Sequence, residues 1–217
     1  MKCLSLAFLL CTLNACSQTS SQKVPQQADI RVGGPCEGCE AIYECPVPFE
    51  QLSPVDTLPD FHDQGEKILL TGKVYESDGV TPAKDVVIYA YHTDQRGLYP
   101  KKGDEKGWAR RHGFIRGWIR TDADGNYSFY TLRPASYPNS NNPQHVHVVI
   151  KEPGKTEYWI VDFLFSDDPL VTKEMREAKN ERGGPGIVTL QMENGMMTAT
   201  RNIYLGRHIP GYPEKKS

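Results

Sequence analysis

The stretch GWIRTDADGNYSFYT, residues 117–131, indicates the fold of this chain. Residues 117–121 form a candidate strand, residues 122–125 have the Asp-x-Asp-Gly composition of a turn, and residues 126–131 form a second strand rich in aromatic side chains. Asp favours such turns because its side chain hydrogen-bonds to nearby backbone amides, and Gly because it accepts positive φ. The stretch therefore predicts two strands joined by a short turn.

More strands precede and follow this pair, and little helix is expected. The 19 glycines and 16 prolines of the 217-residue chain favour many turns between short strands. One segment, residues 170–178, is a candidate helix. We expect one all-β domain over residues 31–217, an antiparallel β-sandwich with long loops. The other candidate strands are residues 68–75, 86–91, 145–150, 158–165, 186–191 and 197–204.

The N-terminus has the pattern of an export signal. Lys2 precedes the apolar residues 4–13, which are too few to span a bilayer, since that takes about 20 residues. The sequence LNAC at residues 13–16 resembles the bacterial lipobox, which implies that residues 1–15 are a lipoprotein signal peptide and that Cys16 is acylated. The polar residues 16–30 would then be a flexible tether. We expect a protein that is exported and lipid-anchored to the bacterial cell envelope, at the periplasmic face or the cell surface.

Export affects the interpretation of the remaining cysteines, Cys36, Cys39 and Cys45. An oxidising compartment favours one disulfide among the three, with one thiol left over, and the sequence leaves the pairing open. A zinc site would need a fourth ligand nearby, and none is evident. The net charge of −2 and the lack of a basic cluster argue against nucleic acid as a partner.

Residues 145–147, His-Val-His, are the first candidate metal ligands. Residues two apart on a strand point to the same face, so His145 and His147 can bind one ion. Imidazole is a good ligand for iron, zinc or copper. On its own, however, such a pair on a strand is as often a surface feature as a metal site. The choice between the two depends on the surrounding sequence.

The sequence around the histidines resembles the intradiol ring-cleavage dioxygenases of the protocatechuate and catechol type. Short matching segments occur in the family's order between Ile68 and Leu170. Each segment is common in proteins, but the whole set in this order is specific to the family. The segments are GKV at 72–74, DGVTPA at 78–83, VVI at 86–88, TDADGNYSF at 121–129, LRP at 132–134, YP at 137–138, PQHVH at 143–147 and FSDDP at 165–169.

The resemblance implies a ferric ion, Fe(3+), held by Tyr99, Tyr137, His145 and His147. Tyr137 lies in the Tyr-Pro element, and Tyr99 stands where the family has its first ligand tyrosine. Phenolate oxygens are hard anionic donors that favour Fe(III) over Fe(II). The implied reaction cleaves a small aromatic diol with O2 to a muconate-type diacid, with Tyr137 also catalytic as an acceptor of a catechol proton. No organic cofactor is implied.

One position departs from the family pattern. The family usually has an arginine just before the Pro-x-His-x-His element, and this chain has Asn142 there. Arginine and asparagine are not interchangeable as stabilisers of negative charge. Either Arg116 or Arg120 from the preceding strand takes over, or the mechanism is altered, or activity is lost. The loop between Tyr137 and His145 is also shorter than usual, which predicts a more open site.

Two other functions compete with the enzyme. The segment at 122–129 also occurs in prealbumin-like and carboxypeptidase-regulatory β-sandwiches, which would make the chain a non-catalytic binding module. The set of tyrosines and histidines favours the enzyme, because a spacer domain has no reason to assemble it. A zinc hydrolase using the two histidines would lack a carboxylate ligand and a general base at motif spacing.

Other features carry less weight. Catechol-type members have a helical N-terminal segment that builds a dimer, and no such helix is evident before Ile68, so a monomer or small homo-oligomer is expected. The charged loop at residues 93–113, which includes Trp108 and His112, is expected to be solvated. No potential partner lies at a spacing from His92 that is typical of a metal-binding or catalytic motif.

Overall fold

The computed structural model describes residues 28–214. The predicted signal peptide, Cys16 and nearly all of the predicted tether lie outside the described residues. Among residues 28–214, no helix combines the length and the apolar character needed to cross a membrane.

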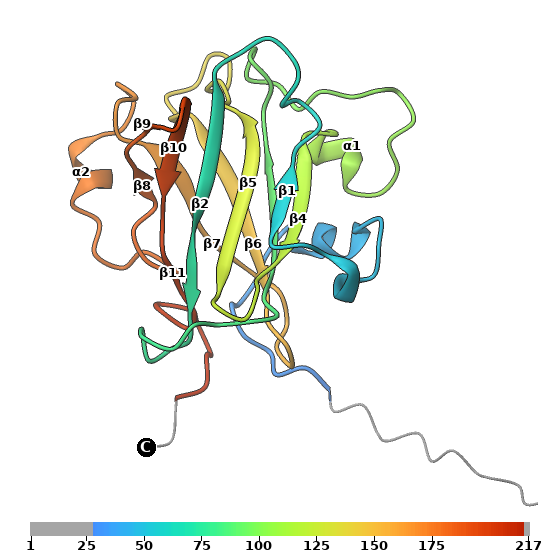
Figure 1. The fold of residues 1–217 in the computed structure, drawn as a ribbon, viewed down its shortest axis with the longest axis vertical. Coiled ribbons are helices and arrows are strands. Elements are labelled where there is room, and N and C mark those ends of the chain that lie inside the picture. The colour runs from blue at the N-terminus through green and yellow to red at the C-terminus, as the bar shows by residue number, and fades with distance from the viewer. Residues whose placement is uncertain (1–27, 215–217) are drawn as a thin grey trace, which may run out of the picture.

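Two sheets pack face to face, which confirms the predicted β-sandwich (Figure 1). One sheet has the strand order β1-β5-β2-β10-β9, and β11 also pairs with β2; the other has the order β4-β3-β6-β7-β8. The strands of the first sheet are β1 (Val55–Thr57), β2 (Lys67–Tyr75), β5 (Asn126–Leu132), β9 (Gln191–Glu193), β10 (Met196–Thr200) and β11 (Ile203–Tyr204). Those of the second sheet are β3 (Val87–His92), β4 (Arg116–Arg120), β6 (His145–Lys151), β7 (Tyr158–Phe165) and β8 (Ile187–Val188).

The predicted strands match the observed ones closely from β2 to β7, and the central pairs of both sheets are antiparallel. Four other pairings are parallel: β1 with β5, β8 with β7, and both β10 and β11 with β2. The predicted strand at 197–204 is divided into β10 and β11. The division falls at Arg201, whose carbonyl accepts a hydrogen bond from the Tyr127 hydroxyl at 2.6 Å and lies where a side chain at Gly72 would overlap it.

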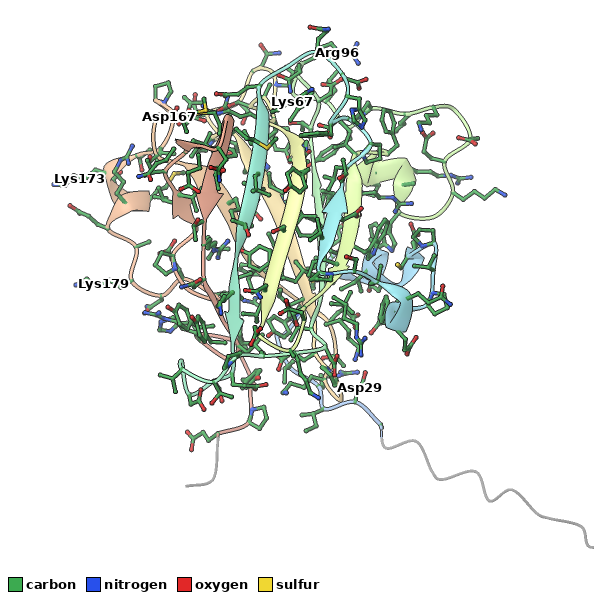
Figure 2. All side chains as sticks on the ribbon, in the orientation of Figure 1. Asp29, Lys67, Arg96, Asp167, Lys173 and Lys179 are labelled. Carbon is green, nitrogen blue, oxygen red and sulfur yellow. A yellow bond between two sulfur atoms is a disulfide. The ribbon has the colours of Figure 1, made fainter. Side chains whose placement is uncertain are left out.

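Two other predictions at the C-terminal end were too long. The strand at 186–191 is reduced to β8 and the first residue of β9. The helix at 170–178 is reduced to α2 (Lys173–Arg176), which begins after Thr172, whose hydroxyl accepts a hydrogen bond from the Met175 amide at 3.3 Å. Figure 2 shows charged side chains of this region, such as Lys173 and Lys179, extending from the outer surface.

The main core fills the space between the two sheets. Alternate residues of each strand point into it, as the two-residue period of a strand requires. The fully buried members include Ile68 and Leu70 of β2, Phe129 of β5 and Ile150 of β6. Because β6 contributes to this core with one face, its other face is free to carry the histidines.

A second, smaller core lies on the outer face of the five-stranded sheet. The 3-10 helix η1 (Cys39–Glu44) covers Tyr89 of β3, Trp118 of β4 and Val149 of β6. The Trp118 indole nitrogen donates a hydrogen bond to the Ile42 carbonyl at 2.9 Å. Cys36 and Cys39 form a disulfide at the start of this segment, and Cys45 is a free thiol.

The sandwich core gives a direct stability test. Ile150 is 0 % exposed, so Ile150→Ala should lower the free energy of unfolding by about 2–5 kcal/mol through lost burial and a residual cavity. Val80 is 73 % exposed, so Val80→Ala should change it by less than about 0.5 kcal/mol. Urea denaturation measures both, and equal effects of the two substitutions would contradict the assignment of the core.

Candidate metal centre

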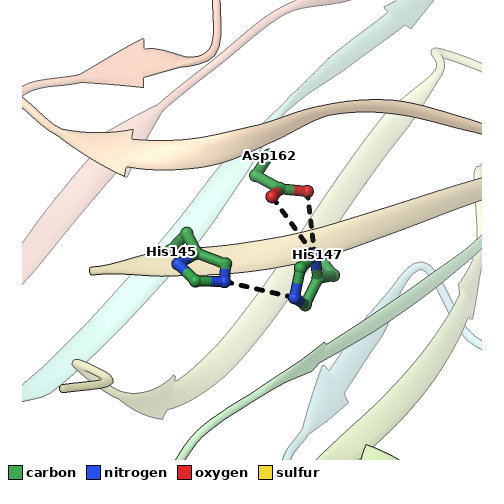
Figure 3. A group of neighbouring side chains, drawn as sticks. All are labelled: His145, His147 and Asp162. Atoms are coloured by element: carbon green, nitrogen blue, oxygen red, sulfur yellow. Dashed lines mark hydrogen bonds and ion pairs between the residues drawn. The ribbon is translucent and has the colours of Figure 1, made fainter. Parts of the chain in front are cut away.

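His145 and His147 lie side by side at the start of β6, on the same face of the strand (Figure 3). Their Nε2 atoms are 3.2 Å apart. His145 is buried, whereas His147 is half-buried. The strands β3 and β7 pair with β6 on either side, so the two imidazoles stand on a strand that is held from both edges.

The two tyrosines come from loops that are held together by hydrogen bonds. Tyr99 follows β3, and Tyr137 lies between β5 and β6. The Thr93 hydroxyl donates to the Ala135 carbonyl at 2.6 Å, and the Ala135 amide donates to the Asp94 carbonyl at 3.2 Å. A side chain at Gly97, where φ is 74°, would overlap the backbone of the Tyr137 loop. This close approach of two backbones brings the phenols to each other.

The phenol oxygens complete a cluster with the two imidazoles. The Tyr99 oxygen lies 2.8 Å from His147 Nε2 and makes a short contact with the Tyr137 oxygen. The Tyr137 oxygen lies 3.1 Å from the Nε2 atoms of both histidines. The structure therefore brings all four sequence-predicted ligands together, each with a donor atom directed at one small region.

Hydrogen bonds at the outer nitrogens fix the tautomers of the two imidazoles. Pro143 offers a carbonyl oxygen 2.6 Å from His145 Nδ1, and Asp162 offers a carboxylate oxygen 3.2 Å from His147 Nδ1. Both Nδ1 atoms must therefore carry the proton, and in neutral rings both Nε2 atoms present a lone pair. These lone pairs face the phenol oxygens of Tyr99 and Tyr137, so either a phenol proton or a metal ion can occupy the space that the four groups share.

The donor set fits a metal ion. Ligand atoms about 2.0–2.2 Å from one ion lie about 3 Å from each other, which is the spacing seen here. Two neutral imidazoles and two phenols that can ionise would give two negative charges to the ion. Hard oxygen donors with imidazole suit Fe(III) better than a soft ion.

Asp162 on β7 supports His147 and is not itself directed at the cluster. Its carboxylate, together with His145 and His147, could form a ligand group, because the donor atoms lie within 4.8 Å of one another. However, it contacts Nδ1 of His147, whereas His145 contacts Nε2 of the same ring (Figure 3). A carboxylate in this place fixes the tautomer and makes the imidazole a stronger ligand. The sequence analysis missed Asp162, because a bulge between Val146 and Val148 changes the register of β6 against β7.

Burial sets the protonation of the cluster in the absence of an ion. It raises the pKa of the Tyr99 and Tyr137 phenols, and the hydrogen bond to Tyr137 raises that of Tyr99 further. Burial and the neighbouring His147 lower the pKa of His145. The phenols therefore keep their protons at neutral pH until a cation displaces them.

Tyr91 and His112 form a stack behind His147. The Tyr91 ring lies 4.5 Å from that of His147 and 3.8 Å from that of His112, and His112 donates to or accepts from the Tyr89 hydroxyl at 2.9 Å. The expectation that this loop is solvated is wrong for His112, which is 6 % exposed. His92, which was expected to have no partner, is fully buried and contacts the Thr131 hydroxyl at 2.6 Å.

Neither candidate arginine points at the four donor atoms. Arg116 of β4 lies opposite Tyr91, but its guanidinium binds Glu44 at 2.6 Å. Arg120 lies opposite Val87, about 13 Å along the strand from Arg116, and binds Asp85 at 2.7 Å. Arg120 thus lies on the same face of β4 as Arg116 but farther along the strand from the four donor atoms. Whether either arginine serves the site stays a prediction. Asn142 is exposed on its loop.

Comparison with known proteins shows the family. The profile of a family described as Dioxygenase matches residues 50–203. The chain is 27 % identical over 134 residues to the protocatechuate 3,4-dioxygenase beta chain of Burkholderia cepacia, covering 56 % of this chain and 57 % of that one. It is 28 % identical over 152 residues to catechol 1,2-dioxygenase 1 of Acinetobacter lwoffii, covering 63 % and 47 %. The chain spans about half the length of these relatives, and it belongs to the intradiol dioxygenase family.

Solved structures share the fold. The dioxygenase domain of a dioxygenase and carbohydrate-binding protein fusion from Streptomyces sp. SirexAA-E superimposes with a TM-score of 0.52 at 21 % identity, covering 74 % of this chain and 93 % of that one. Catechol 1,2-dioxygenase from Pseudomonas arvilla C-1 gives a TM-score of 0.54 at 18 % identity, covering 70 % and 56 %.

The contact between Asp162 and His147 gives a test of the centre. Asp162→Asn removes the charge that orients the imidazole, so the affinity for Fe(III) should fall about 10–100-fold. Asp167→Asn, at an exposed carboxylate that binds Arg133, should leave the affinity unchanged. Competition with a chelator measures both affinities. An Asp162→Asn protein that binds iron like its parent would show that this carboxylate has no part in the centre.

The raised pKa values of the phenols predict how metal binding depends on pH. Because each phenol must lose a proton to bind an ion, the affinity for Ga(III), a colourless substitute for Fe(III), should fall by about tenfold or more per pH unit as the pH is lowered below neutral. Ultraviolet difference spectra should show tyrosinate appearing as Ga(III) binds. Binding without a tyrosinate band would rule out the phenols as ligands.

Proposed function

We propose that the chain is a ring-cleaving dioxygenase that uses Fe(III) to cleave catechol-type aromatics with O2. The bond between the two hydroxyl-bearing carbons breaks, and a muconate-type diacid forms. The observation that carries the proposal is the convergence of the Tyr99, Tyr137, His145 and His147 donor atoms. The relatives named as catechol and protocatechuate dioxygenases support the same reaction.

The residues of the proposed site have different roles. Bound Fe(III) would supply Lewis-acid activation of the diol toward O2. His145 and His147 stand on a paired strand, and their tautomers are held by the Pro143 carbonyl and the Asp162 carboxylate. These two ligands are therefore the rigid half of the centre.

The tyrosines form the adaptable half. Tyr137 is half-buried, and the residues that follow it in its loop, Pro138 and Asn139, are exposed. An ionised Tyr137 oxygen is a base close enough to the cluster to accept a proton from a diol hydroxyl. The half-buried Tyr99, Tyr137 and His147 agree with the open site expected from the short loop.

Oxygen consumption with catechol tests the proposal. Tyr137→Phe removes both a ligand and the proton acceptor, so kcat should fall about 100-fold or more. Tyr130→Phe, at a half-buried tyrosine of β5 that packs on Phe61, should retain the parent's activity and iron content. An iron-loaded parent protein that consumes no oxygen with any of several simple catechols would disprove the proposed reaction.

We further propose that Cys16 carries a lipid and anchors the protein to the cell envelope. The support is the lipobox-like sequence at residues 13–16 and the polar stretch that follows it. Asp29, near the start of the described chain, lies at the opposite end of the sandwich from Arg96 in the Tyr99 loop (Figure 2). The stretch that follows Cys16 would therefore join the sandwich at the end away from the Tyr99 loop.

Detergent phase partitioning tests the anchor. The chain expressed in a bacterium should enter the detergent phase, and Cys16→Ala should move it to the aqueous phase, because the acylated sulfur is gone. Cys45→Ala is the matched control and should not change the partitioning. A parent protein that stays in the aqueous phase would contradict the anchor without bearing on the metal centre.

A further inference from the structure

The Cys36–Cys39 disulfide lies against the side chains that back the candidate metal centre. Gly38 lies between the two cysteines, and a Cβ atom there would be 2.9 Å from Nε2 of His112 and 3.4 Å from the ring of Trp108. His112 stacks on Tyr91, and Tyr91 stacks on His147. The disulfide loop is thus two stacked rings away from a candidate ligand.

The two sulfurs differ in access. Cys36 is half-buried and lines a cavity of about 330 Å³, together with Glu37, Trp159 and Asp162. Cys39, the first residue of η1, is only 1 % exposed. A thiolate arriving from solvent through the cavity can therefore reach Cys36, and Cys39 is shielded. An accessible sulfur followed by a shielded one is the arrangement that thiol–disulfide exchange uses.

The disulfide is not the main interaction that holds residues 36–44 against the five-stranded sheet. Only two residues separate the cysteines, and short loops constrain the unfolded chain less than long ones. The segment is held to the sheet by the Trp118 bond to Ile42, by the ion pair of Glu44 with Arg116, and by the Tyr43 hydroxyl bond to Glu157 at 2.7 Å. Opening the disulfide should therefore leave the domain folded.

We propose that Cys36–Cys39 is a thiol–disulfide exchange site that a small thiol attacks at Cys36. The attacking thiolate bonds to Cys36 Sγ, the bond between the two cysteines breaks, and Cys39 leaves as a thiolate that takes up a proton. A second thiol molecule then displaces Cys36, which leaves two protein thiols and one oxidised dimer of the small thiol. Two electrons pass from the two thiols to the disulfide.

Opening the disulfide also changes the contact between Gly38 and the stacked rings of His112 and Tyr91. With the disulfide closed, the backbone of Gly38, at φ 87°, is held against His112. With it open, residues 36–39 lose the crosslink that fixes this turn, and the contact with His112 loosens. The redox state of the disulfide thereby acts on the support of His147.

Glutathione exchange with the folded protein tests the site. Reduced glutathione should form a mixed disulfide at Cys36 and none at Cys39, as mapped by mass spectrometry after an acid quench. With oxidised glutathione, Cys39→Ser should gain an adduct at Cys36 at least about tenfold faster than Cys36→Ser gains one at Cys39, because Cys39 is shielded. Cys45→Ser should exchange like the parent, since burial raises the pKa of that thiol.

The exchange site can also be tested on the parent protein, so the test does not depend on the folding of a variant. A disulfide that reacts only after denaturant is added, or an adduct on Cys39 as fast as on Cys36, would overturn the exchange site. Reduction should also speed amide hydrogen exchange at residues 38–44 about tenfold or more, with β2 and β5 unchanged. Unchanged protection of residues 38–44 in the reduced protein would overturn the proposed loosening of the stack.

Discussion

The fixed orientation of the His145 and His147 rings is the constraint on which this end of the sandwich depends. Each Nδ1 is committed to an acceptor, the Pro143 carbonyl or the Asp162 carboxylate, so each Nε2 must be an acceptor itself. The phenol protons of Tyr99 and Tyr137 can satisfy these two acceptors, and a metal ion that displaces the protons would meet all four donor atoms at once. The surrounding elements hold the imidazoles in this orientation before an ion binds, which is how a preformed metal site is built.

The two kinds of ligand are positioned in different ways. The histidines stand on β6, which is paired on both edges and contributes its other face to the core through Ile150. The tyrosines stand on loops that are fastened to each other near Thr93 and Ala135. A strand sets side-chain positions rigidly, whereas a loop can move by a small rotation of its backbone. The proposed reaction, in which a substrate would replace one ligand, would benefit from this difference.

The histidine pair and most of the fold could be predicted from local pattern alone. The two-residue period of a strand puts His145 and His147 on one face, and the Asp-x-Asp-Gly turn at 122–125 marks the pairing of its flanking strands. Tyr99 and Tyr137 lie in loops that have no periodicity, so only the family resemblance pointed to them. Long-range contacts were beyond the sequence: Asp162 depends on a bulge in the pairing of β6, and His112 is buried by a stack with Tyr91.

In the function proposed above, both tyrosines and both histidines bind one ferric ion. The most direct measurement is a resonance Raman spectrum of the iron-loaded protein, excited in its visible charge-transfer band. We expect tyrosinate ring vibrations to be enhanced, to weaken in both Tyr99→Phe and Tyr137→Phe, and to shift when catechol is added without oxygen. A protein that holds iron at stoichiometric level but has no visible band and no tyrosinate vibrations would contradict the account.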